Sequence, residues 1–472
     1  MEWRHDGGRA MKRTLLEAAG ALGAQLVGDD RPFEAVSTDS RTLPAGALFV
    51  GLRGPNFDGA DFAAAALARG AAGAIVERAL TDVQLPYIHV PNSLAALQLL
   101  ARRWRAEFAI PLVGIGGSNG KTTTKEMTAA ILSRLGPCLA TQGNLNNHIG
   151  VPLTLLCLER THRSAVIEMG ANRIGDVAEL VALASPSVGL ITNAGAEHLE
   201  GFGDLDGVAR GEGEMAAGLA PAAAAVINAD DAYASYWRSV ATGARVVTFG
   251  VRAQADFKAK DIAQSIEGGR FATRFTLECP LGRSTIALQA GGAHNISNAL
   301  AAAAAAAAAG ASLEHIAAGL ADFRAVAGRL QLKAGLRDSW IIDDSYNANP
   351  SSVRAGLDVL RTLQGPAWLV LADMAELGAH SPDSHAELGR YARECRVARL
   401  FALGPESTRA VETFGAGGEW FADADSLTRR LQAEIAPGVT VLVKGSRVNR
   451  LERVVQALLG GAASSGPMMR AS

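Results

Sequence analysis

The segment LVGIGGSNGKTT, residues 112–123, passes from an apolar strand-like run through a glycine-rich loop into a helix-like stretch. In this arrangement backbone N–H groups at the start of the helix can converge on phosphate oxygens. Lys121 is placed to reach the β- and γ-phosphates of a nucleotide, and the Thr122 hydroxyl to bind Mg²⁺. Ile115 stands where the usual pattern has its first glycine. A glycine-rich turn that binds no nucleotide is the alternative.

The residues beyond this loop alternate between strand-like and helix-like patterns. Residues 165–168 and 188–191 resemble buried strands and flank a helix-like stretch at 177–183. Strands that alternate with helices predict a mostly parallel sheet covered by helices. Two strand-like runs within 271–289 predict a hairpin, and the alanine run 301–309 predicts a tightly packed helix.

Two further α/β segments flank this central one. We expect helices at 15–26 and 60–67 and strands at 48–52, 74–76 and 87–90 in the first; strands at 340–342, 368–371, 400–403 and 439–443 belong to the second. At about 150 residues per domain, a chain of 472 residues holds roughly three domains. The predicted α/β domains are 1–106, 107–327 and 328–472. We expect the first ten residues and the tail from Gly460 to be poorly ordered.

Composition excludes several classes of protein. The formal net charge of -2 offers no basic field for nucleic acid, and 49% hydrophobic residues with 19% charged residues indicate an ordered chain. The four cysteines form no CxxC pair, which favours a reducing cytoplasm. Neither a signal peptide nor an apolar stretch approaching about 20 residues is present, so no membrane insertion is expected.

Two residues near strand ends are candidate metal ligands. Glu168 closes one apolar strand, and His198 follows another beside Glu197 and Glu200. The carboxyl ends of parallel strands meet at one edge of a sheet, where a metal held by the phosphate loop would lie. A solvated strand-end Glu168 and a structural His198 are the alternatives.

Other polar clusters have both structural and functional interpretations. Asn295 and Asn298 lie one helical turn apart, so their amides could contact adenine or ribose, or could cap a helix. The stretch 344–350 follows a predicted strand and contains an Asn-Pro turn. Lys444 ends another strand, where it could face a substrate or only solvent. Residues 37–41 could form an ordinary Ser/Asp turn.

Longer strings carry a resemblance to a known family. Residues 114–123, GNLNN at 143–147, EMGAN at 168–172, 193–203 and HNISN at 294–298 resemble the ATP-dependent Mur ligases of peptidoglycan synthesis. DSYNANP at 344–350 and DMAELG at 373–378 look like the member that adds D-alanyl-D-alanine. The matches run in order from Ser37 to Arg447, nearly the whole chain.

The resemblance implies an N-terminal domain for the UDP-sugar, a central P-loop domain for ATP and a C-terminal Rossmann-like domain that closes over both. The implied catalytic residues are Lys121, Glu168 and His198. The implied ATP-binding residues are Gly117, Ser118, Asn119, Gly120, Lys121, Thr122, Thr123, Asn295, Asn298, Arg329 and Asp344. The implied substrate-binding residues are Ser40 and Arg41 on the uridine side, Asn144, Asn146 and Asn147 at the muramoyl end, and Asn347, Asn349 and Lys444 on the closing domain.

One residue departs from the family pattern at the implied metal site. Without gaps, the family's metal-bridging lysine, usually carbamylated, falls at Glu212. A glutamate supplies a permanent carboxylate on a shorter arm, so we hypothesise that Glu212 joins Thr122, Glu168 and His198 as a metal ligand without carbon dioxide. A second departure is Gly116, where the family often has threonine; we expect it to loosen the loop.

The expected activity is ATP-driven peptide-bond formation through an acyl phosphate, with ATP and Mg²⁺ as cofactors. The expected partners are UDP-N-acetylmuramoyl-tripeptide and D-alanyl-D-alanine, and we expect a monomer. A sister ligase adding an acidic or diamino acid, or a folylpolyglutamate synthetase, is the nearest rival. A P-loop switch explains residues 114–123 but not the strings around Asn144, His198 and Asn298.

Overall fold

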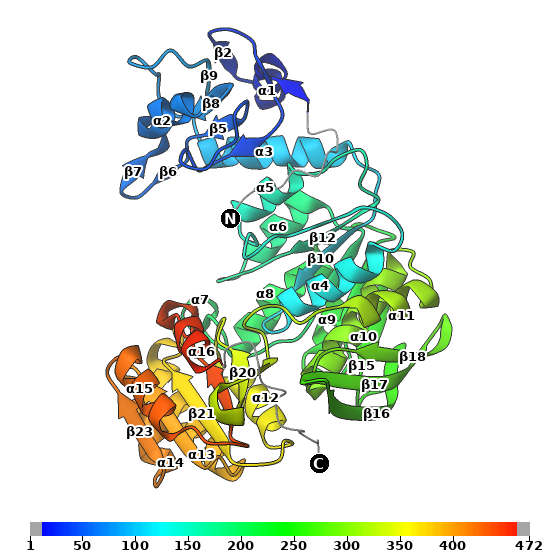
Figure 1. Ribbon diagram of the computed structural model, residues 1–472. Coiled ribbons are helices and arrows are strands. Elements are labelled where there is room, and N and C mark those ends of the chain that lie inside the picture. Colours follow the sequence, from blue (N-terminus) through cyan, green and yellow to red (C-terminus); the bar gives the residue numbers. More distant parts are fainter. Residues whose placement is uncertain (1–11, 460–472) are drawn as a thin grey trace.

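The computed structural model describes residues 12–459, whose strands form three main sheets of five, nine and six strands in an elongated α/β molecule (Figure 1). The N-terminal sheet has the order β2 (Gln25–Val27), β9 (Tyr87–His89), β8 (Gly73–Val76), β5 (Leu48–Val50) and β4 (Val36–Ser37). Only β2 runs antiparallel to its neighbour in this sheet. Short pairs join β1 (Arg13–Thr14) to β3 (Pro32–Phe33) and β6 (Arg53–Gly54) to β7 (Phe57–Asp58).

The expected helix at 15–26 is wrong in its last four residues. Helix α1 (Leu15–Leu22) ends at Gly23, whose φ of 63° is left-handed and stops the helix. The residues after Gly23 enter strand β2. Similarly, the expected helix at 60–67 begins as a 3-10 turn, Gly59–Phe62, before α2 (Ala63–Ala68).

The central sheet carries the phosphate loop. Its order is β11 (Cys138–Ala140), β12 (Ser164–Glu168), β10 (Leu112–Gly116), β13 (Val188–Ile191), β14 (Ala224–Asn228), β15 (Arg245–Gly250), β16 (Phe257–Glu267), β17 (Arg270–Cys279) and β18 (Gly282–Leu288). The strands are parallel from β11 to β16, and the predicted hairpin is confirmed by the antiparallel pair β17 and β18. Because β10 lies between β12 and β13, their carboxyl ends meet beside the loop.

Helices cover both faces of the central sheet. One apolar core joins the sheet to α4 (Lys121–Leu132), α10 (Ala293–Ala308) and α11 (Leu313–Asp322). The other joins it to α5 (Gly150–Leu155), α6 (Asp176–Ala184), α8 (Leu205–Ala217) and α9 (Ala234–Val240), and reaches α3 (Ser93–Ala106) and the N-terminal sheet. The predicted alanine helix is confirmed: residues 302–306 of α10 are fully buried, and their small side chains let α10 pack closely against α4.

The C-terminal sheet has the order β19 (Gln331–Ala334), β20 (Trp340–Asp344), β24 (Thr440–Lys444), β21 (Ala367–Ala372), β22 (Arg399–Leu403) and β23 (Gly418–Phe421). Only β19 is antiparallel in this sheet. Its flanking helices are α12 (Pro350–Leu360), α13 (Ser381–Glu394), α14 (Thr408–Phe414), α15 (Ala424–Glu434) and α16 (Glu452–Leu458). Adjacent β20 and β24 place Asp344 opposite Lys444.

The three-domain α/β fold is confirmed, while the boundaries at 106/107 and 327/328 stay predictions. The expected disorder of the first ten residues and of the tail from Gly460 lies outside the described residues. Within residues 12–459, no helix is both long enough and apolar enough to cross a bilayer.

The packing of α11 on α4 yields a test of the fold. A Cβ at buried Gly319 would lie 2.4 Å from the Cα of Ile131, so Gly319→Ala must push the two helices apart. We expect the free energy of unfolding to fall by about 1–3 kcal/mol, because the overpacking outweighs the better helix propensity of alanine. In the control Gly20→Ala, at an exposed position of α1, the new methyl group meets nothing within 4 Å and should stabilise the protein. Thermal unfolding midpoints should move in opposite directions, and equal shifts would contradict this packing.

Candidate active site

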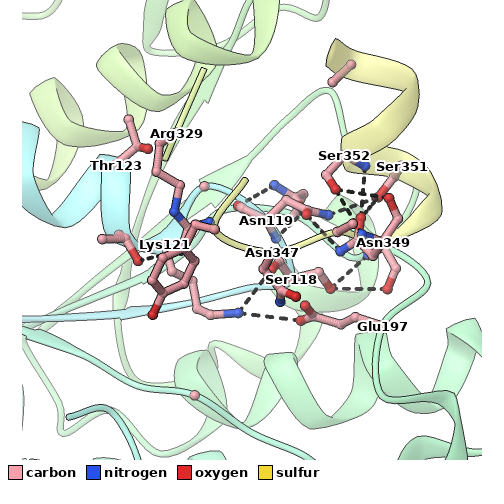
Figure 2. A pocket seen from close by; sticks show the side chains of 18 of the residues that line it. Ser118, Asn119, Lys121, Thr123, Glu197, Arg329, Asn347, Asn349, Ser351 and Ser352 are labelled. Atoms are coloured by element: carbon pink, nitrogen blue, oxygen red, sulfur yellow. Dashed lines mark hydrogen bonds and ion pairs between the residues drawn. The ribbon is translucent and has the colours of Figure 1, made fainter. Parts of the chain in front are cut away.

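A cleft of about 700 Å³ lies between the phosphate loop of the central domain and the strand ends of the C-terminal domain. Figure 2 shows side chains from both domains pointing into it. The predicted site residues that line the cleft are Ser118, Asn119, Gly120, Lys121, Thr122, Thr123, Asn144, Asn146, Asn147, Glu168, His198, Asn295, Asn298, Arg329, Asp344, Asn347, Asn349 and Lys444. Gly117, Glu212, Ser40 and Arg41 do not line it.

The phosphate loop is held in shape by the segment that follows β13. The Ser118 N–H donates to the Asn193 carbonyl at 2.9 Å, and the Asn119 N–H donates to the Asn193 side chain at 3.0 Å. Gly117 has a φ of 110°, and a Cβ there would lie 2.0 Å from the Thr192 hydroxyl, so only glycine fits. The loop leads directly into α4, whose first-turn N–H groups form an anion site at the helix N-terminus.

Lys121 is folded back over the loop in this structure. Its Nζ donates to the carbonyls of Gly117 at 2.5 Å and Ser118 at 3.0 Å, and lies 3.5 Å from Glu197 Oε1 (Figure 2). Burial alone would lower the pKa of Lys121, but the charges of Glu197, Glu212 and Glu168 raise it overall. Burial raises the pKa of Glu197 to about 7, against the opposing effect of Lys121. The nearby carboxylates therefore favour the charged form of the ammonium.

Glu168 offers an oxygen that suits a cation. It ends β12, is 3% exposed, and its Oε1 accepts a hydrogen bond from Asn146 Nδ2 at 3.0 Å. Its Oε2 is buried without a hydrogen-bond partner among the described residues. Buried carboxylate oxygens are normally paired, so an unpartnered one beside a phosphate loop fits a bound metal. The solvated strand-end alternative is wrong.

The other predicted metal ligands differ in their surroundings. The Thr122 hydroxyl accepts a hydrogen bond from Arg329 at 3.3 Å. His198 Nδ1 lies 3.0 Å from Glu376 Oε2, and burial lowers the pKa of His198. Across residues 12–459 no three His, Cys, Asp or Glu side chains form a closed metal cage. Mg²⁺ does not need one, because it commonly binds through one or two carboxylates plus phosphates and water.

Glu212 does not lie where we expected a metal-bridging carboxylate. It is 1% exposed in α8, beneath the loop, and its Oε2 accepts a hydrogen bond from the Gly117 N–H at 2.5 Å. A Cβ at Gly116 would lie 2.9 Å from the same oxygen. Gly116 thus makes room for Glu212, which differs from the looser loop that we expected.

Asn295 and Asn298 share one face of α10. The Asn295 amide donates to the Gly291 carbonyl at 2.8 Å, and the Asn298 amide donates to Asn295 Oδ1 at 3.1 Å. The helix begins after Gly292 without a side-chain cap, so the capping alternative is wrong. Both amides form part of the cleft wall instead.

Asn349 joins the two domains at the loop. It caps α12 by accepting from the Ser352 N–H, and its Nδ2 donates to Asn119 Oδ1 at 2.9 Å. Asn119 Nδ2 in turn donates to Ser351 Oγ at 2.9 Å. Where an Asn-Pro turn was predicted, Asn349 is instead the extended N-cap of α12, and the same side chain makes an interdomain contact.

Lys444 is buried rather than solvated. It is 2% exposed, and its Nζ donates to Asp344 Oδ2 at 2.5 Å and to the Asn347 carbonyl at 3.1 Å. The solvated-strand-end alternative for Lys444 is wrong. The pair places one positive and one negative group on the C-terminal wall of the cleft.

Ser40 and Arg41 lie in the N-terminal domain, which Figure 1 places at the opposite end of the molecule from the C-terminal domain. Ser40 is 7% exposed, whereas the Arg41 side chain is 85% exposed and pairs with Asp39 at 2.9 Å. Their uridine contacts stay a prediction.

Several cleft residues were not predicted. Glu197 pairs with Lys121, and Glu376 pairs with His198. The Tyr346 ring lies 4.2 Å from the Arg329 guanidinium, a cation–π contact. Glu197 is adjacent to the predicted His198, and Glu376 lies within the quoted string DMAELG at 373–378, so both had a signal in the sequence. Their pairing with Lys121 and His198 follows from the tertiary structure.

Comparison with known proteins places the chain in a class. Residues 32–105 match the catalytic domain of the Mur ligase family, 115–306 the Mur ligase middle domain, and 328–447 the Mur ligase glutamate ligase domain. The chain belongs to the Mur ligase family.

Individual relatives show which Mur ligases the chain is similar to. The chain is 44% identical over 448 residues to the UDP-N-acetylmuramoyl-tripeptide–D-alanyl-D-alanine ligase of Escherichia coli K12, covering 94% of this chain and 98% of the relative. A crystal structure of MurF from Acinetobacter baumannii is 33% identical with a TM-score of 0.89, covering 95% and 99% of the two chains. MurF of Thermotoga maritima in complex with ADP is 28% identical with a TM-score of 0.79, covering 90% and 96%.

The interdomain contacts of Asn119 yield a second test. Asn119→Ala removes its side-chain hydrogen bonds to Asn349 and Ser351, each worth about 0.5–1.5 kcal/mol net. We expect the C-terminal domain to spend more time away from the loop, so that small-angle scattering reports a larger radius of gyration. Asn144→Ala, which alters the same cleft, is the control. A radius unchanged from the parent protein would contradict this docking contact.

Proposed function

We propose that this protein joins D-alanyl-D-alanine to UDP-N-acetylmuramoyl-tripeptide with hydrolysis of ATP to ADP and phosphate. The product is the UDP-muramoyl-pentapeptide precursor of peptidoglycan. The supporting observation is the cleft between phosphate loop and C-terminal domain, in a chain similar over nearly its full length to ligases of that name. We further propose that the protein acts as a monomer in the cytoplasm.

The reaction needs an activated carboxylate, because a free carboxylate is a poor acyl donor. The terminal carboxylate of the tripeptide attacks the γ-phosphate of ATP, which forms an acyl phosphate and releases ADP. The amine of the dipeptide then attacks the acyl carbonyl through a tetrahedral intermediate that expels phosphate. Such chemistry depends mainly on positioning and on neutralising negative charge.

We assign the steps of this reaction to particular residues. Lys121 leaves the carbonyls of Gly117 and Ser118 and neutralises the transferred phosphoryl group. Loop residues Gly117 to Gly120 position the first turn of α4, whose N–H groups bind the remaining phosphate oxygens. The residues proposed for the rest of ATP are Asn295, Asn298, Arg329 and Asp344. Those proposed for the substrates are Ser40, Arg41, Asn144, Asn146, Asn147, Asn347, Asn349 and Lys444.

Magnesium fits this site. We propose Thr122, Glu168 and His198 as the residues that hold it; Glu168 carries the unpartnered buried oxygen. When bound, the ion neutralises charge that develops on the phosphate oxygens. Glu212 is left out of this set, because its carboxylate is bonded to the loop backbone.

The activity is tested by phosphate release and product mass. Phosphate release should need both UDP-N-acetylmuramoyl-tripeptide and D-alanyl-D-alanine, and the product should gain the mass of the dipeptide less water. Lys121→Ala should lower kcat by about 100-fold or more, as for loss of a group that stabilises transition-state charge. Because Lys121 also compensates buried carboxylates, kcat is compared on protein whose folding is verified by thermal unfolding. Lys260→Ala, on β16 beside Glu278 and outside the cleft, is the control. Phosphate release that ignores the dipeptide would indicate a nucleotide switch instead.

The magnesium ligand is tested by Glu168→Gln. Glutamine keeps an acceptor for Asn146 but removes the charge, so we expect the Mg²⁺ concentration for half-maximal rate to rise about tenfold, equivalent to about 1.4 kcal/mol. ADP binding in EDTA should stay close to that of the parent protein. A variant with the parent's Mg²⁺ requirement would remove Glu168 from the proposed metal site.

A further inference from the structure

A buried carboxylate lies directly beneath the phosphate loop. Glu212 reaches it from α8, is 1% exposed, and accepts a hydrogen bond from the Gly117 N–H at 2.5 Å. A charge-assisted bond of this kind is stronger than one between neutral groups. The contact joins Gly117 in the phosphate loop to α8, which lies on the opposite face of the central sheet from α4.

The Glu212 carboxylate fits beneath the loop because residue 116 is a glycine. A Cβ at Gly116 would lie 2.9 Å from Glu212 Oε2, closer than real Cβ contacts. Gly116 does not have a positive φ, so space rather than backbone conformation requires glycine there. Residues 116 and 212 therefore fit together as a pair.

The Glu212 carboxylate also attracts the ammonium of Lys121 electrostatically. Burial raises the pKa of the Glu212 carboxyl, and the positive charge of Lys121 and the Gly117 hydrogen bond act in the opposite direction by favouring the carboxylate. Gly117 connects the two, because its N–H donates to Glu212 while its carbonyl accepts from Lys121 at 2.5 Å. Loop backbone, carboxylate and ammonium thus form one unit before a nucleotide arrives.

We propose that Glu212 is a positioning residue, which holds Gly117 and Lys121 in the conformation that receives phosphate, and is not a ligand of the metal. This inference rests on the nucleotide site proposed above. A positioning residue acts whether or not the ion is present. A metal ligand affects nucleotide affinity only when the ion is present.

Calorimetric titration of ADP into the full-length protein, in EDTA and in excess Mg²⁺, separates the two roles. Glu212→Ala should weaken ADP binding about tenfold or more in both conditions, the usual effect of losing a hydrogen bond to a charged group. Glu212→Gln, which keeps an acceptor for Gly117, should stay within about threefold of the parent protein, since a neutral acceptor loses only part of the bond. Weaker binding of Glu212→Ala in Mg²⁺ alone, or unchanged binding in both conditions, would overturn the proposal.

Two further variants keep the test decisive. Gly116→Ala inserts a methyl group against Glu212 Oε2 and should weaken ADP binding in both conditions, even if Glu212→Ala does not fold. Parent-like binding of Gly116→Ala would overturn the proposal. Glu214→Ala is the control, because this α8 carboxylate accepts from the N–H groups of Gly175 and Ala178, away from the loop; it should bind ADP normally. A parent protein that binds no ADP would instead refute the nucleotide site itself.

Discussion

The backbone of the phosphate loop is the constraint on which the rest of the cleft depends. Its N–H groups at Gly117, Ser118 and Asn119 all donate to other parts of the central domain, namely Glu212 and Asn193. These bonds fix the loop, while α4 begins after it, at Lys121, with first-turn N–H groups of the kind that can bind an anion. The side chain of Asn119 forms hydrogen bonds with Asn349 and Ser351, so the loop that we propose for phosphate binding also contacts the C-terminal domain.

Charge in the cleft is arranged around a few buried groups. Three carboxylates act on Lys121, while Lys444 is neutralised by Asp344 within its own sheet. The protein's near-zero net charge is therefore compatible with binding highly anionic substrates, because local cations are held in place by local carboxylates. A nucleotide phosphate would replace the neutral carbonyl oxygens that Lys121 now contacts and would bring its negative charge to an ammonium that is already in place.

The fold could be predicted from the sequence where local pattern and tertiary packing agree. The strands of the central sheet, the hairpin at β17 and β18 and the alanine helix have strong local signals, so their prediction is confirmed. The helix at 15–26 was too long, because the Ala- and Leu-rich pattern hid the stop at Gly23. Several wall residues of the cleft, such as Glu168, Asp344 and Lys444, end strands and were predicted. Glu376 pairs with His198, which lies far away along the chain. Glu212 was found by alignment with a motif, but only the packing against Gly116 reveals which atoms it contacts.

The central claim is that Lys121 exchanges loop carbonyls for phosphate when a nucleotide binds. A crystal structure of the protein with ADP and Mg²⁺ tests it most directly. The account predicts Lys121 Nζ within hydrogen-bond distance of a phosphate oxygen and no longer on the Gly117 carbonyl, with the Glu212 bond to the Gly117 N–H retained. ADP bound with Lys121 still on that carbonyl, or bound outside the cleft, would contradict it.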